Sequence, residues 1–418
     1  VELPLHYADH EAYQLVCGYR RKLELPADIA GKRYFLQFDG AAHIASVFVN
    51  GIAAGEHRCG YTAFQLDITG LVKPGENEVA VRLDTTENPE VPPFGFVIDY
   101  LTYGGLYREA WLIEKNASFI RDVTVVTPTV DRAEIEVETE NFSGEVDYAI
   151  LTQSGETLWH SREKKLKVSA QRLSARSWRP EEPNRYVLRV RLMNGGEVLD
   201  EEQVIFGFRT AEFNADGFYL NGEKFFLRGL NRHQSFPYIG YAATESLQRE
   251  DARILKEELH CTAVRTSHYP QSQYFIDECD KLGLLVFTEI PGWQHIGDAQ
   301  WKEQACTNVE EMVKQYRNHP SIILWGVRIN ESVDDDAFYR QTNKIAHKLD
   351  ASRATSGVRY LEKSKLLEDV YAFNDFSHTG NNPGCKPKKK VSPNRSKAFL
   401  ISEHSGHMFP TKSFDPWA

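Results

Sequence analysis

The fold is decided by the stretch Ser321-Ile322-Ile323-Leu324-Trp325-Gly326-Val327-Arg328-Ile329-Asn330-Glu331, an apolar run that ends in an amide beside a carboxylate. A run of this kind is typical of a strand buried on both faces, as in a parallel sheet. A second strand-like run, Ala398-Phe399-Leu400-Ile401-Ser402-Glu403, also ends in a carboxylate. The sequence therefore predicts two acidic side chains at the C-terminal ends of two parallel strands.

The surrounding sequence alternates strands and helices from about residue 211 onward. The predicted strands cover residues 225–230, 263–265, 284–287, 322–325, 355–358, 369–373 and 399–401. The predicted helices cover residues 245–259, 271–282, 301–317 and 335–349. This alternation indicates a parallel sheet, and the number of units favours a (β/α)8 TIM barrel. Because only seven strands precede residue 418, we expect the barrel to be truncated before its eighth strand, in a piece of a longer polypeptide.

The first half of the chain has a different pattern, made of short β-rich runs separated by turns. Residues 1–115 include Ala45-Ser46-Val47-Phe48-Val49 followed by Asn50-Gly51, which is a strong hairpin signal and indicates an antiparallel β-sandwich. Residues 116–209 have the size and strand spacing of an immunoglobulin-like β-sandwich without its cysteine pair. With a barrel at 210–418, the chain is predicted to have three domains.

Composition narrows the class of protein. The balance of 49 basic and 59 acidic residues gives a net charge of −10, which disfavours a nucleic-acid partner. No apolar stretch is long enough to span a membrane. The six cysteines show no C-x-x-C spacing, which argues against a zinc or redox site and favours free thiols in a reducing, cytoplasmic compartment. The chain starts at Val1 rather than Met, so a removed leader stays open.

Polar clusters follow five of the predicted barrel strands, at the face where barrel active sites are built. They contain His233 after the first strand, Arg265 and His268 after the second, Glu289 and Trp293 after the third, Glu331 after the fourth and Glu403 after the seventh. Paired carboxylates at this face are what glycoside hydrolysis requires. As an alternative, the two glutamates could be salt-bridge partners.

The other members of these clusters also have structural explanations. His233 or His268 could be a hydrogen-bonded core histidine, and Arg265 could pair with a barrel carboxylate such as Glu289. Trp293 could be part of the core, or it could be a platform on which the C–H face of a sugar stacks. A structural role explains one or two clusters more easily than five.

Two segments resemble the signature blocks of glycoside hydrolase family 2. They are Arg265-Thr266-Ser267-His268-Tyr269-Pro270 and the stretch from Asn318-His319-Pro320 through Asn330-Glu331. That family holds β-galactosidases, β-glucuronidases and β-mannosidases. Its members begin with a jelly-roll sugar-binding domain, continue with an immunoglobulin-like domain and end in the barrel, so the resemblance covers the whole chain.

The resemblance implies a role for each carboxylate. Glu331 would be the general acid/base and Glu403 the nucleophile of a retaining mechanism, which needs its carboxyl groups roughly 5 Å apart. Two like charges so close do not both ionise easily, so one of the pair is expected to stay protonated. Asn330 would bind the sugar 2-hydroxyl, a contact that strengthens in the transition state.

Further site residues follow from the same resemblance. Asp99 resembles the sandwich-domain aspartate that reaches into the barrel and holds sugar hydroxyls; the alternative is a loop aspartate in a turn. Together with Asp99 and Asn330, the expected substrate-binding residues are His233, His268, Trp293 and Asn374. The expected supporting residues are Arg265, Glu289 and His407.

The chain departs from the family pattern at several positions. Trp293-Gln294-His295 stands where β-galactosidases have a magnesium-binding Glu-x-His, so we expect no metal site and no required cofactor. A tyrosine that usually contacts the nucleophile is replaced by Asn374 or Asp375, and Thr262 stands in place of an asparagine. The histidine after the nucleophile is shifted, with His404 and His407 as candidates.

These observations predict an exo-acting retaining β-glycosidase of the β-galactosidase type, acting on a small β-glycoside or an oligosaccharide. The alternatives are a β-glucuronidase, for which Lys412 could pair with a substrate carboxylate, a β-mannosidase, or a non-catalytic carbohydrate-binding protein or inactive fragment. Family members often assemble, so a homo-oligomer stays open, although no interface is evident in the sequence.

Overall fold

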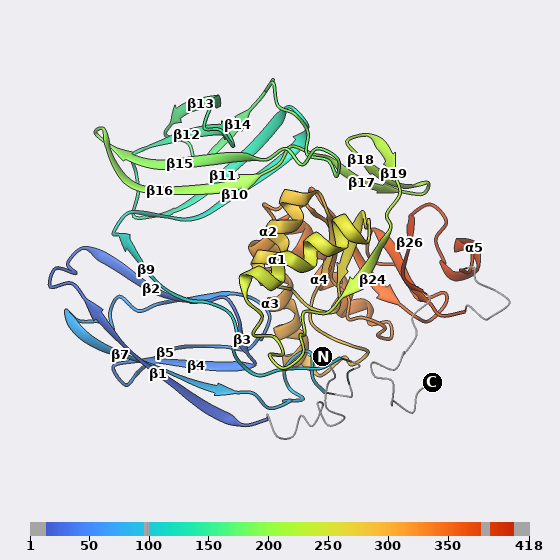
Figure 1. Cartoon of the computed structure of the whole chain (residues 1–418), viewed down its shortest axis with the longest axis horizontal. Coiled ribbons are helices and arrows are strands. Elements are labelled where there is room, and N and C mark those ends of the chain that lie inside the picture. The colour runs from blue at the N-terminus through green and yellow to red at the C-terminus, as the bar shows by residue number, and fades with distance from the viewer. Residues whose placement is uncertain (1–13, 96–97, 99, 378–384, 405–418) are drawn as a thin grey trace.

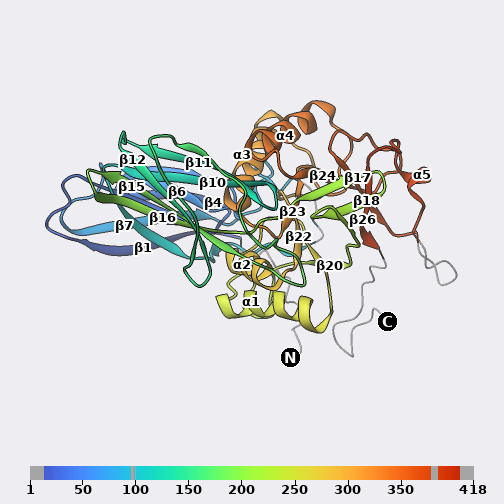
Figure 2. The same ribbon diagram turned by 90° about the horizontal axis from the view of Figure 1, so that it is seen from above.

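The computed structural model describes residues 14–95, 98, 100–377 and 385–404. Two β-sandwiches lie on one side of a mixed strand-and-helix barrel (Figure 1). The first sandwich is drawn in blue, the second in green, and the barrel runs from yellow to red. Turning the molecule by 90° keeps the sandwiches together at one end and the barrel at the other (Figure 2).

The first sandwich consists of two antiparallel sheets. One sheet has the order β1 (Val16–Leu25), β7 (Gly75–Asp84), β4 (Ile44–Val49) and β5 (Ile52–His57). The other has the order β6 (Phe64–Asp67), β2 (Lys32–Phe38) and β9 (Ala110–Asn116), and the short strands β3 (Ala41–Ala42) and β8 (Gly105–Leu106) pair beside them. The predicted hairpin is present between β4 and β5, because Asn50 and Gly51 both have positive φ, at 51° and 80°, as its tight turn requires.

The second sandwich has seven strands in two sheets, as an immunoglobulin-like domain does. The smaller sheet has the order β10 (Phe119–Thr129), β11 (Arg132–Glu140) and β14 (Lys167–Ala170). The larger has the order β13 (Thr157–Glu163), β12 (Glu145–Thr152), β15 (Tyr186–Asn194) and β16 (Glu197–Phe206). Alternate residues of β15 are buried, which places one face of this sheet against the core between the sheets.

The barrel is a nearly closed parallel sheet whose seven strands follow one another in chain order. The strands are β20 (Gly229–Arg232), β21 (Ala263–Thr266), β22 (Leu285–Glu289), β23 (Ile322–Gly326), β24 (Ala354–Arg359), β25 (Val370–Asp375) and β26 (Ala398–His404). Because β20 and β26 are the two ends of this order, each has one edge without a strand partner among the described residues.

Helices cover the outside of the first four barrel strands. They are α1 (Glu245–Arg253) with its π-helical extension η2 (Ile254–Glu258), α2 (Gln273–Leu282), α3 (Ala299–Tyr316) and α4 (Asp336–Leu349). Beyond β24, the described residues contain a single helix, the short α5 (Lys388–Val391).

One predicted strand is wrong. Residues 225–230 do not form a single strand: Phe225 ends a small antiparallel sheet of β17 (Ala211–Asn214), β18 (Gly217–Leu220) and β19 (Glu223–Phe225), and the first barrel strand begins only at Gly229. Phe225 and Leu227 pack with Phe218 and Leu285 in one cluster, whereas Phe226 and Leu230 are exposed, so the apolar run does not form one continuous buried strand.

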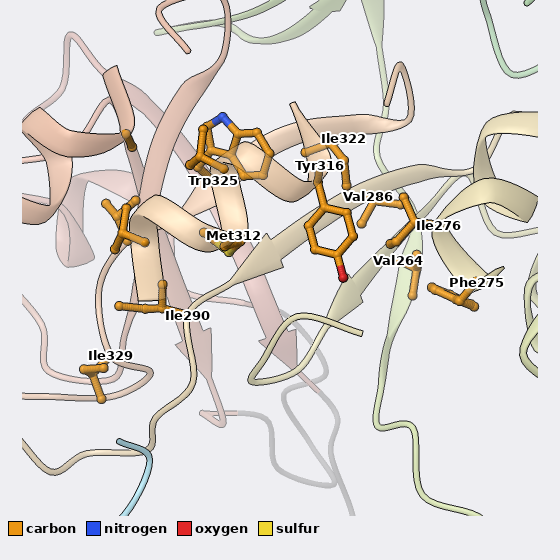
Figure 3. Close-up of a cluster of buried hydrophobic side chains, with 14 of the residues drawn as sticks. Val264, Phe275, Ile276, Val286, Ile290, Met312, Tyr316, Ile322, Trp325 and Ile329 are labelled. Atoms are coloured by element: carbon orange, nitrogen blue, oxygen red, sulfur yellow. The ribbon is translucent and has the colours of Figure 1, made fainter. Parts of the chain in front are cut away.

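The largest buried cluster lies between the barrel sheet and its helices, and Figure 3 shows part of it. Trp325 of β23 is fully buried there, and its indole N–H donates to Asp350 Oδ2 at 3.0 Å. Tyr316 and Met312 of α3 pack in the same cluster. The apolar run before Glu331 is therefore anchored on both faces, which fixes where the polar end of the strand emerges.

All six cysteines of the chain are free thiols. In the part of the chain that the structure describes, no helix has the length and apolar character needed to cross a membrane.

Candidate active site

Glu331 lies just beyond the C-terminal end of β23. Its backbone N–H donates to Val358 O of β24 at 3.0 Å, and the preceding Asn330 forms an isolated parallel bridge with Trp293. Glu331 has φ of 54°, a left-handed conformation that non-glycine residues seldom adopt and that costs on the order of 1–3 kcal/mol. Contacts to β24 and to the loop after β22 thus hold this carboxylate in a strained turn.

The carboxylate of Glu331 receives hydrogen bonds from neutral amides. Asn374 Nδ2 donates to Oε1 at 2.9 Å, and Gln294 Nε2 donates to Oε2 at 3.4 Å. Among the described residues, no Lys, Arg or His lies within ion-pair distance of Glu331.

Glu403 lies in β26, where it is the register partner of Asn374 in β25. Its Oε1 accepts a hydrogen bond from Arg265 Nη1, and its side chain keeps 20% of its surface exposed. The neighbouring Ser402 Oγ donates to Asn374 Oδ1 at 3.0 Å. Asn374 therefore joins the strand of Glu403 to the carboxylate of Glu331.

Arg265 is the centre of this network and is almost completely buried. Its Nη2 donates to Glu289 Oε1 at 2.7 Å and to Asn330 Oδ1 at 2.8 Å, and its Nε donates to Glu289 Oε2 at 3.1 Å. Burial raises the pKa of the Glu289 carboxyl, while Arg265 acts in the opposite direction. The ion pair with Glu289, which the sequence left as an alternative role for Arg265, is present, and the same guanidinium also contacts Glu403.

His233 and His268 lie next to each other, with ring centroids 5.4 Å apart and planes at 79°. His268 Nδ1 is 2.7 Å from Glu289 Oε1, and His233 Nδ1 is 3.2 Å from the Tyr269 hydroxyl. Burial, followed by the positive charge of neighbouring groups, lowers the pKa of His233 to about 3 and that of His268 well below its usual value. Both rings are therefore neutral near pH 7, and because Nδ1 of each ring already has the partner given above, Nε2 is the ring nitrogen left for a hydroxyl group.

Trp293 belongs to the same region through its backbone bridge to Asn330. Its indole Nε1 is buried and has no hydrogen-bond partner among the described residues.

The Trp293-Gln294-His295 segment does not fit a divalent cation. Trp293 offers no ligand oxygen, and the ring of His295 packs closely against Gly95 of the first sandwich and edge-on against Trp301. A group that could hold a metal, Asp277, Asp280 and His319, lies elsewhere, before β22 and β23 rather than after them.

The two residues that could replace the family's tyrosine have different positions. Asn374 contacts Glu331, whereas Asp375 accepts hydrogen bonds from the backbone N–H groups of Ser377 and Lys386 at 3.0 and 2.7 Å. Asp375 therefore stabilises the following loop. Asp99, His407 and Lys412, singled out from the sequence, lie outside the described residues.

Three residues that contact the candidate site residues were not predicted from the sequence. Gln294 contacts Glu331, the ring of Tyr100 lies 5.2 Å from that of His233, and Tyr269 contacts His233 through its hydroxyl. Tyr269 follows His268 within a signature block, which was a usable signal. The Gln294 contact depends on how two barrel loops meet, and the Tyr100 contact on how a sandwich loop meets the barrel.

Models of known protein families match most of this chain. Three family models match in succession: the sugar binding domain of glycosyl hydrolases family 2 at residues 1–116, a further domain of that family at 118–209, and its TIM barrel domain at 212–412. The chain belongs to glycosyl hydrolases family 2.

Relatives within family 2 carry two kinds of names. A β-galactosidase from Thermoanaerobacter pseudethanolicus is 43% identical over 433 residues, covering 99% of this chain and 57% of the relative. A β-galactosidase from Thermoanaerobacterium thermosulfurigenes is 44% identical, covering 99% and 61%. The crystal structure of an FMN-binding β-glucuronidase from Facaelibacterium prausnitzii L2-6 superimposes with a TM-score of 0.81 at 29% identity, covering 87% of this chain and 60% of that one. The chain thus spans about six tenths of the length of these curated relatives.

Proposed function

We propose that the protein is a retaining exo-β-glycosidase that hydrolyses terminal β-galactosides through a covalent glycosyl-enzyme. Glu331 is the general acid/base and Glu403 the nucleophile. The observation that carries this proposal is the position of Asn374, which hydrogen-bonds Glu331 at 2.9 Å from the strand position directly beside Glu403. Neighbouring strands lie about 4.8 Å apart, so this bridge supports the short separation that a double displacement needs.

The surroundings of the two carboxylates support this division of roles. Arg265 contacts Glu403, and a charge-assisted hydrogen bond of this kind fixes the orientation of the carboxylate that would attack the anomeric carbon. Glu331 is bound by the neutral amides of Asn374 and Gln294 and, among the described residues, by no cation. The asymmetry matches an acid/base catalyst opposite a nucleophile.

The reaction would proceed in two displacements. In the first, Glu403 attacks the anomeric carbon while Glu331 gives its proton to the leaving oxygen, and the glycosidic bond breaks. In the second, Glu331 removes a proton from water, the water oxygen attacks the same carbon, and Glu403 leaves. Because Arg265 donates to Asn330 Oδ1, the amide NH2 of Asn330 is the group left to donate to the sugar 2-hydroxyl.

The sugar would be recognised by neutral groups. His233 and His268 supply hydrogen bonds to hydroxyls, and Trp293 supplies an indole N–H and an aromatic face. No cofactor is needed, since the two carboxylates carry the chemistry, and a chelator should leave turnover unchanged. The free cysteines favour a reducing, cytoplasmic location.

Galactose is the preferred sugar because the relatives at 43% and 44% identity are β-galactosidases. The second candidate is a glucuronide, since the structural neighbour with a TM-score of 0.81 is a β-glucuronidase.

The substrate proposal is tested by incubating the protein with nitrophenyl β-galactoside, β-glucuronide and β-mannoside under identical conditions. We expect the galactoside to be hydrolysed fastest, with release of β-galactose as the first product. Faster hydrolysis of the glucuronide would replace the sugar assignment, and no turnover of any of the three would contradict the activity.

A further inference from the structure

His233 and His268 of the candidate site are not held by the barrel alone. The loops that follow β20 and β21 carry His233 and His268, and both loops contact the first sandwich. The hydrogen bonds that join both loops to the sandwich at this point come from Arg108, in the turn between β8 and β9. We propose that Arg108 is the positioning residue through which this sandwich fixes the orientation of His233 and His268, an inference that deepens the proposed function.

Arg108 joins the two domains with both arms of its guanidinium. Nη1 donates to Tyr61 O at 2.9 Å and to Asp39 O at 3.2 Å, both in the sandwich. Nη2 donates to Gln234 Oε1 at 3.0 Å and to Pro270 O at 3.2 Å, both in the barrel. The planar fork of an arginine can reach four acceptors in this way, whereas the ammonium of a lysine has three donors on one atom.

The partners of Arg108 are neutral oxygens. Among the described residues, no carboxylate lies within ion-pair distance of its guanidinium. Gln234 and Pro270 are buried, so their oxygens have no water to replace the arginine. Loss of the fork would leave buried acceptors unpaired, which is more costly than losing a surface contact.

Each barrel acceptor is coupled to a histidine. Gln234 directly follows His233, and Pro270 is two residues after His268. Between them, the Tyr269 hydroxyl accepts from the Gln234 backbone N–H and contacts His233 Nδ1, each at 3.2 Å. The two loops therefore form one unit, and Arg108 attaches this unit to the sandwich.

A second side chain of the sandwich contacts both imidazoles. The ring centroid of Tyr100 lies 5.2 Å from that of His233 and 5.8 Å from that of His268. A shift of the two loops relative to the sandwich would therefore change the packing on both histidines together. This is the expected consequence of weakening the Arg108 contact.

The molecule offers a matched control in Arg209. This buried arginine also links a sandwich to the barrel through backbone carbonyls, donating to Pro320 O at 2.8 Å and to Ile322 O at 2.6 Å. These carbonyls lie at the start of β23, the opposite end of the barrel from the site. Arg209→Lys should therefore lower stability as Arg108→Lys does, without reaching the histidines.

The first readout needs no substrate. In protein labelled with ¹⁵N at histidine, the ring signals of His233 and His268 are assigned by the His233→Gln and His268→Gln variants. We expect Arg108→Lys to shift both sets of signals and Arg209→Lys to leave them in place. Unchanged signals in folded Arg108→Lys would overturn the proposal, even if the protein hydrolyses no glycoside.

The second readout is kinetic. With the best nitrophenyl glycoside, Arg108→Lys should lower kcat/KM by about 10-fold to 100-fold, because displaced binding groups cost this much, while Arg209→Lys should not change it. If Arg108→Lys does not fold, Gln234→Leu removes the acceptor from the barrel side and is compared in the same way. Wild-type kinetics in a folded variant of either kind would contradict a positioning role. An inactive wild type would count against the proposed function alone, since the ring signals still decide the positioning role.

Discussion

The sequence offered two residues, Asn374 and Asp375, for the place of the tyrosine that family members have, and it could not decide between them. Both residues directly follow the sixth predicted barrel strand, and the sequence alone does not show which side chain points into the barrel. Successive strand residues point to opposite faces, so only one of them can reach Glu331. In the structure that residue is Asn374, while Asp375 binds the backbone of the next loop.

Replacement of Asn374 by Asp gives a first prediction. The new carboxylate would stand about where an amide now lies 2.9 Å from Glu331, and two like charges so close do not both ionise easily. We expect Glu331 to stay protonated to higher pH, so the alkaline limb of the kcat/KM profile moves up by about one pH unit or more. Asn394→Asp, in a loop before β26, is the control; an unmoved alkaline limb in Asn374→Asp would argue against Glu331 as the acid.

His233 gives a prediction about stability and pH. Its pKa is lowered from 6.5 to about 3 in the folded protein, so between these values the unfolded chain binds more protons. The stabilisation is complete above pH 6.5 and is lost as the pH falls toward 3. His233→Gln should therefore lose less free energy of unfolding than the wild type does between pH 7 and 4 in urea titrations. The exposed His260→Gln should behave as the wild type; equal slopes for all three proteins would show that His233 is not held neutral.

At the scale of elements, the helices and six of the seven barrel strands were predicted close to their observed positions, and one short apolar strand was not. Helices predicted at 301–317 and 335–349 are observed at Ala299–Tyr316 and Asp336–Leu349, each begun by an aspartate that caps a backbone N–H. The predicted strand at 225–230 was wrong because a short apolar run does not reveal which sheet it joins. Contacts between domains, such as those of Arg108, have no local sequence signal.

A substitution at Gly326 tests whether β22 and β23 must lie as close together as the structure shows. A Cβ added at this position would lie 2.3 Å from Glu289 Cβ and 2.8 Å from its Cα. Gly326→Ala should therefore push Glu289 and its partner Arg265 out of place, with a loss of about 1–3 kcal/mol of stability and of most turnover. Gly70→Ala, where no atom lies within 4 Å, is the control; a Gly326→Ala protein as stable and active as this control would disprove the tight contact.

At the scale of the whole molecule, the barrel is attached to both sandwiches by buried polar contacts. Glu311 of α3 accepts from Thr62 Oγ1 at 2.6 Å and contacts His57 Nε2 at 3.0 Å, both in the first sandwich. The site histidines depend on this same domain through Arg108. We therefore expect the first sandwich to be a structural part of the active site and not a detachable module.

Glu311→Ala tests this attachment. Removal of the carboxylate leaves the Thr62 and His57 groups without their acceptor, at a cost of about 1–3 kcal/mol, and should separate the unfolding of the sandwich from that of the barrel in calorimetry. Glu310→Ala is a control on the same helix, since Glu310 pairs only with the exposed Lys314 among the described residues. A single transition at the control's temperature would mean that Glu311 does not hold the domains together.

The assignment of Glu403 as the nucleophile is tested most directly by trapping the covalent intermediate. The protein is incubated with a 2-deoxy-2-fluoro-β-galactoside that has a dinitrophenyl leaving group, digested, and mapped by mass spectrometry. We predict one fluoroglycosyl group on the peptide that contains Glu403, at that side chain. A label on Glu331 or Glu289, or steady hydrolysis of galactosides with no covalent adduct, would contradict the account.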